Sequence, residues 1–150
     1  MREILRKLID GSITLDEAER ELRITAIAEV ASLAKIDINR QARKGIPEII
    51  LAEGKSTGDV VKIALETVSR TGRAIVSRAS ADVIEALKAA VLADVSLDVR
   101  EPARIVILRG LGIRPEPTGG KVGVLTAGTS DIPVADEVRV VAEEMGCAVI

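Results

Sequence analysis

The sequence has no aromatic residue, no histidine and a single cysteine among its 150 residues. Without Phe, Tyr or Trp, the chain offers no ring on which a nucleic-acid base could stack, which disfavours RNA-binding and single-strand-binding folds. Without His, there is no Ser-His or Cys-His dyad and no imidazole ligand for a metal ion. One cysteine excludes both an intramolecular disulfide and a Cys-rich zinc site.

Charge and hydropathy exclude further classes. The chain carries 21 basic and 23 acidic side chains, a net charge of −2, which argues against binding to polyanions. No uncharged apolar run approaches the roughly 18 residues of a membrane span. The opening residues, MREILR, are too charged for a signal peptide. We therefore expect a cytoplasmic protein that binds neither nucleic acid nor membranes and has an aliphatic core.

Apolar spacing and turn residues predict alternating helices and strands. Thr14 and Glu17 form a capping box for a helix from Leu15. The spacing over 23–36 fits a helix, although residues 24–27 also fit a strand. The remaining predicted helices cover 3–9, about 57–71 and the segment after Ser80. The predicted strands cover 49–51, 73–78, 95–99 and 104–108, and the first of them is expected to be buried.

Glycine and proline crowd residues 109–120, which indicates a linker. After it, a strand over 122–126, a loop and a helix with Pro133 in its first turn lead to a strand over 147–150. The expected inner stripe of that helix is Val134, Val138, Val141, Ala142 and Met145. The fold class is thus α/β: a small mixed domain over 1–108, the linker over 109–120, and the first βαβ of a truncated parallel domain over 121–150.

Two basic segments are candidate anion sites. Asp37, Arg40, Arg43 and Lys44 have helical spacing, and residues 35–44 carry a net charge of +3 that could clamp a phosphate or carboxylate. A solvated helix face is the alternative. Gly54-Lys55-Ser56 resembles the end of a P-loop without its first glycine, so Lys55 could meet an anion at a helix start or simply be solvated.

Two further candidates follow predicted strands. Arg78 lies just after a strand end, where ligands of α/β sheets commonly bind. Residues 127–131 join a strand to a helix N-terminus and offer two hydroxyls, a carboxylate and the open backbone of Gly128, which suits phosphate. An ordinary helix cap by Ser130 or Asp131 is the alternative. Cys147 opens an apolar strand and is expected to be a small buried hydrophobe.

Two motifs carry a resemblance to a known family. The stretch from Gly120 to Ala135, GKVGVLTAGTSDIPVA, resembles the start of the PurE-like domain of the LarB family. Upstream, Asp37-x-x-Arg40-x-x-Arg43-x-Gly45-x-Pro47-Glu48, followed by Gly54-Lys55-Ser56, is similar to that family's N-terminal signature. The resemblance covers the chain from about Ile13 and implies a flavodoxin-like three-layer fold for the second domain.

The resemblance implies an enzyme that makes pyridinium-3,5-biscarboxylic acid mononucleotide for a nickel-pincer cofactor. Such an enzyme adds CO₂, drawn from bicarbonate, to the pyridinium ring of nicotinic acid adenine dinucleotide and cleaves the phosphoanhydride to release AMP. By the same resemblance, Gly128, Thr129, Ser130 and Asp131 would hold phosphate and ribose. The basic residues Arg40, Arg43, Lys55 and Arg78, with Asp37, would meet the anionic substrate.

The sequence also departs from the family pattern. The family's cysteine, whose thiolate is thought to add to the ring, would lie beyond Ile150, and Cys147 does not match it. We therefore expect these 150 residues alone to be inactive and the complete protein to be a homo-oligomer. No metal-ligand cluster is recognisable in the sequence. Two other functions stay open: a PurE-type aminoimidazole ribonucleotide carboxylase or mutase, and a non-enzymatic assembly or regulatory module.

Overall fold

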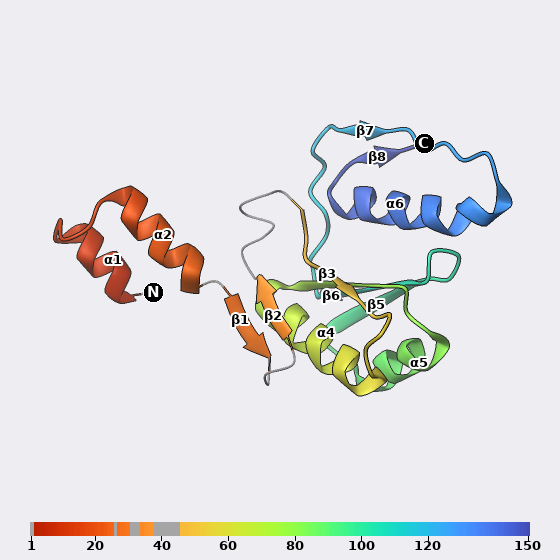
Figure 1. Cartoon of the computed structure of the whole chain (residues 1–150), viewed down its shortest axis with the longest axis horizontal. Coiled ribbons are helices and arrows are strands. Elements are labelled where there is room, and N and C mark those ends of the chain that lie inside the picture. The colour runs from red at the N-terminus through yellow and green to blue at the C-terminus, as the bar shows by residue number, and fades with distance from the viewer. Residues whose placement is uncertain (1, 26, 31–33, 38–45) are drawn as a thin grey trace.

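The computed structural model describes residues 2–25, 27–30, 34–37 and 46–150, and the side chains discussed below belong to residues 2–22 and 46–150 (Figure 1). Helices α1 (Arg2–Ile9) and α2 (Leu15–Thr25) pack against each other through the buried side chains of Ile4 and Ala18. The predicted capping box is confirmed. The Thr14 N–H donates to the Glu17 carboxylate at 2.8 Å, and the Glu17 N–H donates to Thr14 Oγ1 at 3.3 Å.

The helix predicted over 23–36 is wrong beyond its first turn. Helix α2 ends at Thr25, and an antiparallel pair follows, made of β1 (Ile27–Val30) and β2 (Ala34–Asp37), with Ile27 opposite Asp37. The sequence of β2 alternates apolar Ala34 and Ile36 with polar Lys35 and Asp37. That period of two is the period of a strand, and it prevails over the weaker helical spacing.

A mixed four-stranded sheet forms the centre of the molecule. Its order is β3-β4-β6-β5, in which β3 is parallel to β4 and the other neighbours are antiparallel. The sequence predicted all four strands, whose bounds are β3 Ile49–Leu51, β4 Arg73–Ser77, β5 Val95–Arg100 and β6 Ile105–Gly110. Strand β3 lies at the sheet edge and buries only Ile50, so the expectation that it is wholly buried is wrong.

Helices α4 (Thr57–Thr71) and α5 (Ala81–Ala90) cover one face of this sheet (Figure 1). Ser56 and Ser80 cap them, each accepting a hydrogen bond from the N–H three residues later. Gly72, at φ 77°, ends α4 in the left-handed conformation that favours glycine. The core on this face includes Val60, Ala64, Ala74, Val76, Leu87, Val106 and Leu108.

The last part of the chain is a βαβ unit, as predicted. Strands β7 (Lys121–Val122) and β8 (Ala148–Val149) are parallel and flank η1 (Thr129–Asp131) and α6 (Ile132–Glu144) in sequence. The strands are shorter than expected, but hydrogen bonds continue the ladder: the Val124 N–H donates to the Ile150 carbonyl and the Ile150 N–H to the Val122 carbonyl.

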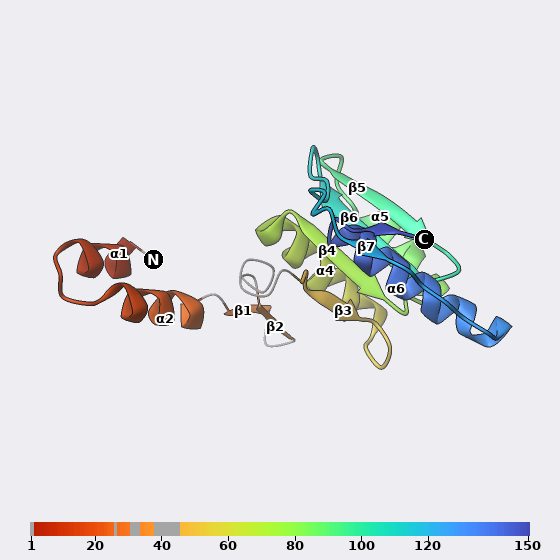
Figure 2. The ribbon, with the colours of Figure 1, turned by 90° about the horizontal axis from the view of Figure 1, so that it is seen from above.

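Helix α6 lies between the β7–β8 pair and the four-stranded sheet, as Figure 1 shows; Figure 2 gives the same region from above. On one side, Val140 packs with Ile75, Ile105 and Ile107, which point to the sheet face opposite α4 and α5. The predicted inner stripe is confirmed at Ala142, which is buried, and Val141 and Met145 are half-buried. It is wrong at Val134 and Val138, which are 59% and 47% exposed. The helix packs on two layers, so a single stripe cannot describe it, and its most buried residues are Val140, Ala142 and Glu144.

The glycine- and proline-rich segment crosses the end of α6. The Thr118 N–H donates to the Gly146 carbonyl at 2.9 Å, and a Cβ on Gly146 would lie 2.0 Å from the Glu116 carbonyl oxygen. Gly146, at φ 82°, is thus required both by its own backbone and by this close approach. The division of the chain at this segment stays a prediction, but the segment is held against the helix that follows it.

Candidate functional site

The loop 126–131 follows β7 and leads into α6. Thr126 Oγ1 donates to the Gly128 carbonyl at 3.1 Å, and the Asp131 N–H donates to the same carbonyl at 3.1 Å. Ser130 Oγ donates to the Asp131 carboxylate at 3.3 Å, and no side chain caps α6 at Asp131. The ordinary side-chain cap that the sequence left open is therefore not made. Thr129, Ser130 and the first residues of α6 are exposed, and the Ile132 N–H donates to the Thr129 carbonyl.

A cavity of about 310 Å³ adjoins this loop. Apolar side chains make most of its wall, and the Asp131 carboxylate supplies charge at its edge; the lining residues are Val124, Leu125, Thr126, Ala127, Asp131, Val134, Ala135 and Val138. Small-molecule sites are commonly concave and apolar, with a few placed polar groups, and begin at about 300 Å³. The exposure of Val134 and Val138 comes from their position on this cavity.

Polar side chains also gather where β3 and β4 end. Arg78 Nη1 donates to the Glu53 carboxylate at 2.7 Å, and both side chains are more than half exposed. This hydrogen bond raises the pKa of the Arg78 guanidinium, with smaller contributions from the charges of Glu53 and Glu137. Ser77 Oγ donates to the Glu137 carboxylate. Since Glu137 belongs to α6, this edge of the sheet lies beside the first half of α6.

The structure places Arg78 near α6, because the charge of Glu137 acts on its guanidinium. In the described part of the chain, no hydrogen bond or ion pair joins Arg78 or Lys55 to the loop Gly128–Asp131. Lys55 Nζ donates to the Leu51 carbonyl at 2.8 Å and so closes the turn after β3. The side chains of Asp37, Arg40, Arg43 and Lys44 lie outside the described residues, so the basic patch over 35–44 stays a prediction.

A buried ion cluster joins α6 to the sheet, and no sequence motif indicated it. Arg73 Nη1 donates to the Glu144 carbonyl at 2.6 Å and to its carboxylate at 3.1 Å. Arg109 also binds the Glu144 carboxylate and contacts Asp98 Oδ2 at 3.5 Å, while Arg100 Nε donates to Asp98 Oδ1 at 3.0 Å. Glu144 is only 4% exposed. The partners are separated by up to 71 residues in sequence, so helix periodicity alone could not have paired them.

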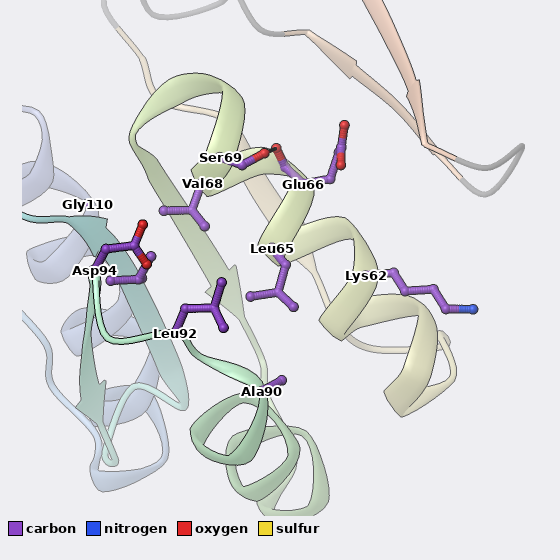
Figure 3. A pocket seen from close by; sticks show the side chains of 10 residues that line it. Lys62, Leu65, Glu66, Val68, Ser69, Ala90, Leu92, Asp94 and Gly110 are labelled. Atoms are coloured by element: carbon purple, nitrogen blue, oxygen red, sulfur yellow. Dashed lines mark hydrogen bonds between the residues drawn. The ribbon is translucent and has the colours of Figure 1, made fainter.

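A larger cavity, of about 780 Å³, is elsewhere: it is a groove between the C-terminal half of α4 and the segment joining α5 to β5 (Figure 3). Leu65, Val68 and Leu92 supply apolar surface, and Lys62, Glu66 and Asp94 lie around them. None of the sequence-predicted site residues lines it. Few polar groups point into this groove, so it is a weaker candidate for a functional site than the cavity beside the loop 126–131.

Other chemistry is sparse in the described part of the chain. Cys147 is half-buried, with Thr118 Oγ1 3.8 Å from its sulfur, so it is less enclosed than predicted. Among the described residues, no three metal-ligating side chains come together. No helix among them has the length and apolarity to cross a membrane.

Comparison with known proteins places the chain in a family. The profile of the LarB/PurE-like N-terminal domain matches residues 27–110, more than half of the chain. The chain belongs to this LarB/PurE-like family. The matched segment covers the β1–β2 pair and the whole four-stranded sheet with α4 and α5. The family is one of carboxylase- and mutase-type enzymes, which agrees with the resemblance carried by the two sequence motifs.

A relative in the archaeon Methanocaldococcus jannaschii, an uncharacterised protein, is 34% identical over 154 residues. The alignment covers 100% of this chain and 59% of that protein. The chain therefore spans about three fifths of the relative's length. The similarity extends past residue 110, so it includes the loop 126–131 and α6 as well as the family-matched segment.

Proposed function

We propose that this chain is the N-terminal part of a LarB-type enzyme acting on nicotinic acid adenine dinucleotide. The enzyme replaces a ring C–H of the pyridinium with a carboxylate taken from CO₂, releasing a proton. It also adds water across the phosphoanhydride, releasing AMP and the biscarboxylated mononucleotide. The family and the two motifs support this reaction, and the relative gives no activity to compare.

The observation that carries the proposal is the loop 126–131. It has two exposed hydroxyl-bearing residues, Thr129 and Ser130, in a short 3₁₀ turn that has no side-chain cap and runs into α6, beside a cavity of about 310 Å³. A helix N-terminus favours an anion because its free N–H groups and its dipole both point at the ligand. In this proposal, Thr129 and Ser130 donate to the phosphate of the mononucleotide half, and the Asp131 carboxylate accepts from a ribose hydroxyl.

The chain's own residues supply binding and orientation in this scheme. The loop fixes the phosphate and ribose, and the apolar wall formed by Val134 and Val138 excludes water from one side of the cavity. By resemblance, a cysteine of the family outside these 150 residues adds to the ring and makes its carbon nucleophilic toward CO₂. Catalysis is thus proposed for a protein that contains both parts.

The test is product analysis on a protein that carries this chain together with a segment corresponding to the part of the Methanocaldococcus jannaschii relative that this chain does not cover. It is incubated with nicotinic acid adenine dinucleotide and ¹³C-bicarbonate, and AMP and labelled biscarboxylated mononucleotide are sought by mass spectrometry. We expect both products, and a loss of at least about tenfold in turnover for S130A or D131N. The matched control is E143Q, an exposed position at the other end of α6. A folded protein that yields neither product refutes the proposal.

A further inference from the structure

Arg78 has an unusual backbone. It adopts φ 53°, and Arg104 adopts φ 51°; among the described residues these are the two non-glycine residues with positive φ. This conformation is unfavourable for an L-amino acid with a side chain, a cost that glycine would avoid. Backbone strain of this kind is concentrated at binding and catalytic sites. Both positions nevertheless carry arginine, which suggests that their guanidinium groups have a use.

Hydrogen bonds join the turn at Arg78 and Ala79 to Arg104. The Ala79 N–H donates to the Arg104 carbonyl at 2.8 Å. In return, the Arg104 guanidinium donates to the carbonyls of Ala79 and Arg78, each at 3.3 Å. Arg104 therefore supports the left-handed turn from which the Arg78 side chain projects.

The Arg78 guanidinium is accessible and has one exchangeable partner. Its side chain is 53% exposed and that of Glu53 is 64% exposed, so solvent reaches both sides of the 2.7 Å contact. Exposed pairs of this type are weak, with a typical value of 0.2–1 kcal/mol, about 1.5- to 5-fold in an equilibrium constant. Glu137, the other carboxylate acting on Arg78, is held by Ser77 and is not free to leave.

The position of Arg78 suits a long anionic ligand that starts at the loop 126–131. Glu137 lies six residues after Asp131 on α6, roughly 9 Å along the helix axis. Arg78 follows Ser77, whose hydroxyl donates to the Glu137 carboxylate, so a dinucleotide bound at the loop could extend to it. A phosphate binds arginine through two parallel hydrogen bonds and is a stronger acceptor than a single exposed carboxylate.

We infer that Glu53 is an internal competitor which Arg78 releases when it binds a phosphate group of the nucleotide, and that Arg104 is the positioning residue for this exchange. The ligand class is a phosphoanhydride-bearing anion. The inference rests on the proposed function for the identity of the nucleotide, but the exchange itself is a property of Arg78, Glu53 and Arg104. Glu53 then turns to solvent, which its exposure allows.

The test is calorimetric titration of the 150-residue chain with nicotinic acid adenine dinucleotide and, separately, with sodium pyrophosphate. E53Q removes the competitor and should raise affinity about two- to fivefold. R78Q should lower affinity about tenfold or more, because it removes a charged donor. The matched control is E66Q, which takes the carboxylate from the exposed Arg70 on α4 and should change nothing.

The positioning role of Arg104 is tested by a double-mutant cycle. If Arg104 only stabilises the fold, R104Q lowers the melting temperature and the gain from E53Q survives. If it positions Arg78, the gain from E53Q disappears in the R104Q background, while R104K restores part of it. Circular dichroism at the titration temperature verifies that each variant is folded.

The outcomes separate the two proposals. If E53Q behaves like E66Q, or if the wild type binds neither probe, the exchange is refuted. If pyrophosphate binding depends on Glu53 and Arg78 while the carboxylation assay yields no product, the exchange stands and the proposed function fails. If product forms but E53Q has no effect on affinity, only the exchange fails.

Discussion

Removing the Glu144 carboxylate should strongly destabilise the protein. Glu144 is 4% exposed, and the side chains of its partners Arg73 and Arg109 are 7% and 17% exposed. In E144A, both guanidinium groups lose their shared carboxylate and stay buried. Arg73 keeps the backbone carbonyl of residue 144 and Arg109 keeps Asp98, but Arg109 Nε already lacks a hydrogen-bond partner among the described residues. Removing one partner of a buried ion pair typically costs about 3–5 kcal/mol.

That cost is a large part of the 5–15 kcal/mol by which a typical domain is stable. For a chain of about 150 residues, it corresponds to a fall in melting temperature of about 6–20 °C. The assay is urea unfolding followed by circular dichroism at 222 nm, since the chain has no aromatic residue to report by fluorescence. The slope of unfolding free energy against urea concentration should stay the same, while the urea concentration at the midpoint of unfolding falls.

The matched control is E143A on the same helix. Glu143 pairs with Arg139 at 3.4 Å, and both side chains are more than one third exposed, so its loss should cost about 0.2–1 kcal/mol. E144Q keeps the shape but not the charge and should fall between the two. If E144A costs no more than E143A, the buried cluster does not anchor α6 to the sheet, and the reasoning is refuted.

Three further predictions follow from single contacts. The hydrogen bond from Arg100 lowers the pKa of Asp98 below its usual 3.8, so the ionised Asp98 stabilises the fold above that pH and loses this effect as the pH falls through the lowered pKa. In D98N, the free energy of unfolding should therefore fall less steeply below about pH 4. The same pH dependence in D98N and wild type would contradict this. G146A should cost far more than G119A, because both have positive φ but only Gly146 meets the Glu116 carbonyl; equal melting temperatures would show that the segment moves aside. T14A should destabilise α2 by about 0.5–2 kcal/mol, because it removes the hydroxyl that accepts from the Glu17 N–H. Hydrogen exchange of the α1 and α2 amides measures this effect separately, and unchanged exchange rates in α2 argue against it.

Local signals predicted most of the elements. Ser80 marked the start of a helix, and its cap is found where expected, as is the end of α4 at Thr71. These signals act within three or four residues, so they need no knowledge of the fold. The same holds for the capping box at Thr14, whose two hydrogen bonds are both present.

Predictions that depended on distant neighbours were less accurate. The stripe over Val134 and Val138 was assigned to a core because a helix usually has one buried face. In this fold, α6 lies between two sheets, and those residues line a cavity while Glu144 is buried among arginines. Pairs such as Ser77 with Glu137, or Arg78 with Glu53, are separated by 60 and 25 residues and left no local trace.

The candidate site was predicted in part. The loop 127–131 was identified from its place between a strand and a helix, and Arg78 from its place after a strand. Glu53 and Arg104 were missed, because an exposed carboxylate and a surface arginine have no distinguishing pattern in sequence. The left-handed backbone at Arg78 and Arg104 is visible only in the structure.

The most direct test of the proposed site is a titration of the ¹⁵N-labelled chain with nicotinic acid adenine dinucleotide, followed by two-dimensional NMR. The loop 126–131, the first turn of α6 and residues 78–81 are expected to show the largest amide shift changes. The groove lined by Leu65, Val68 and Leu92 is larger and serves as an internal control, where little change is expected. Shifts confined to that groove, or no shifts at saturating nucleotide, would contradict the assignment.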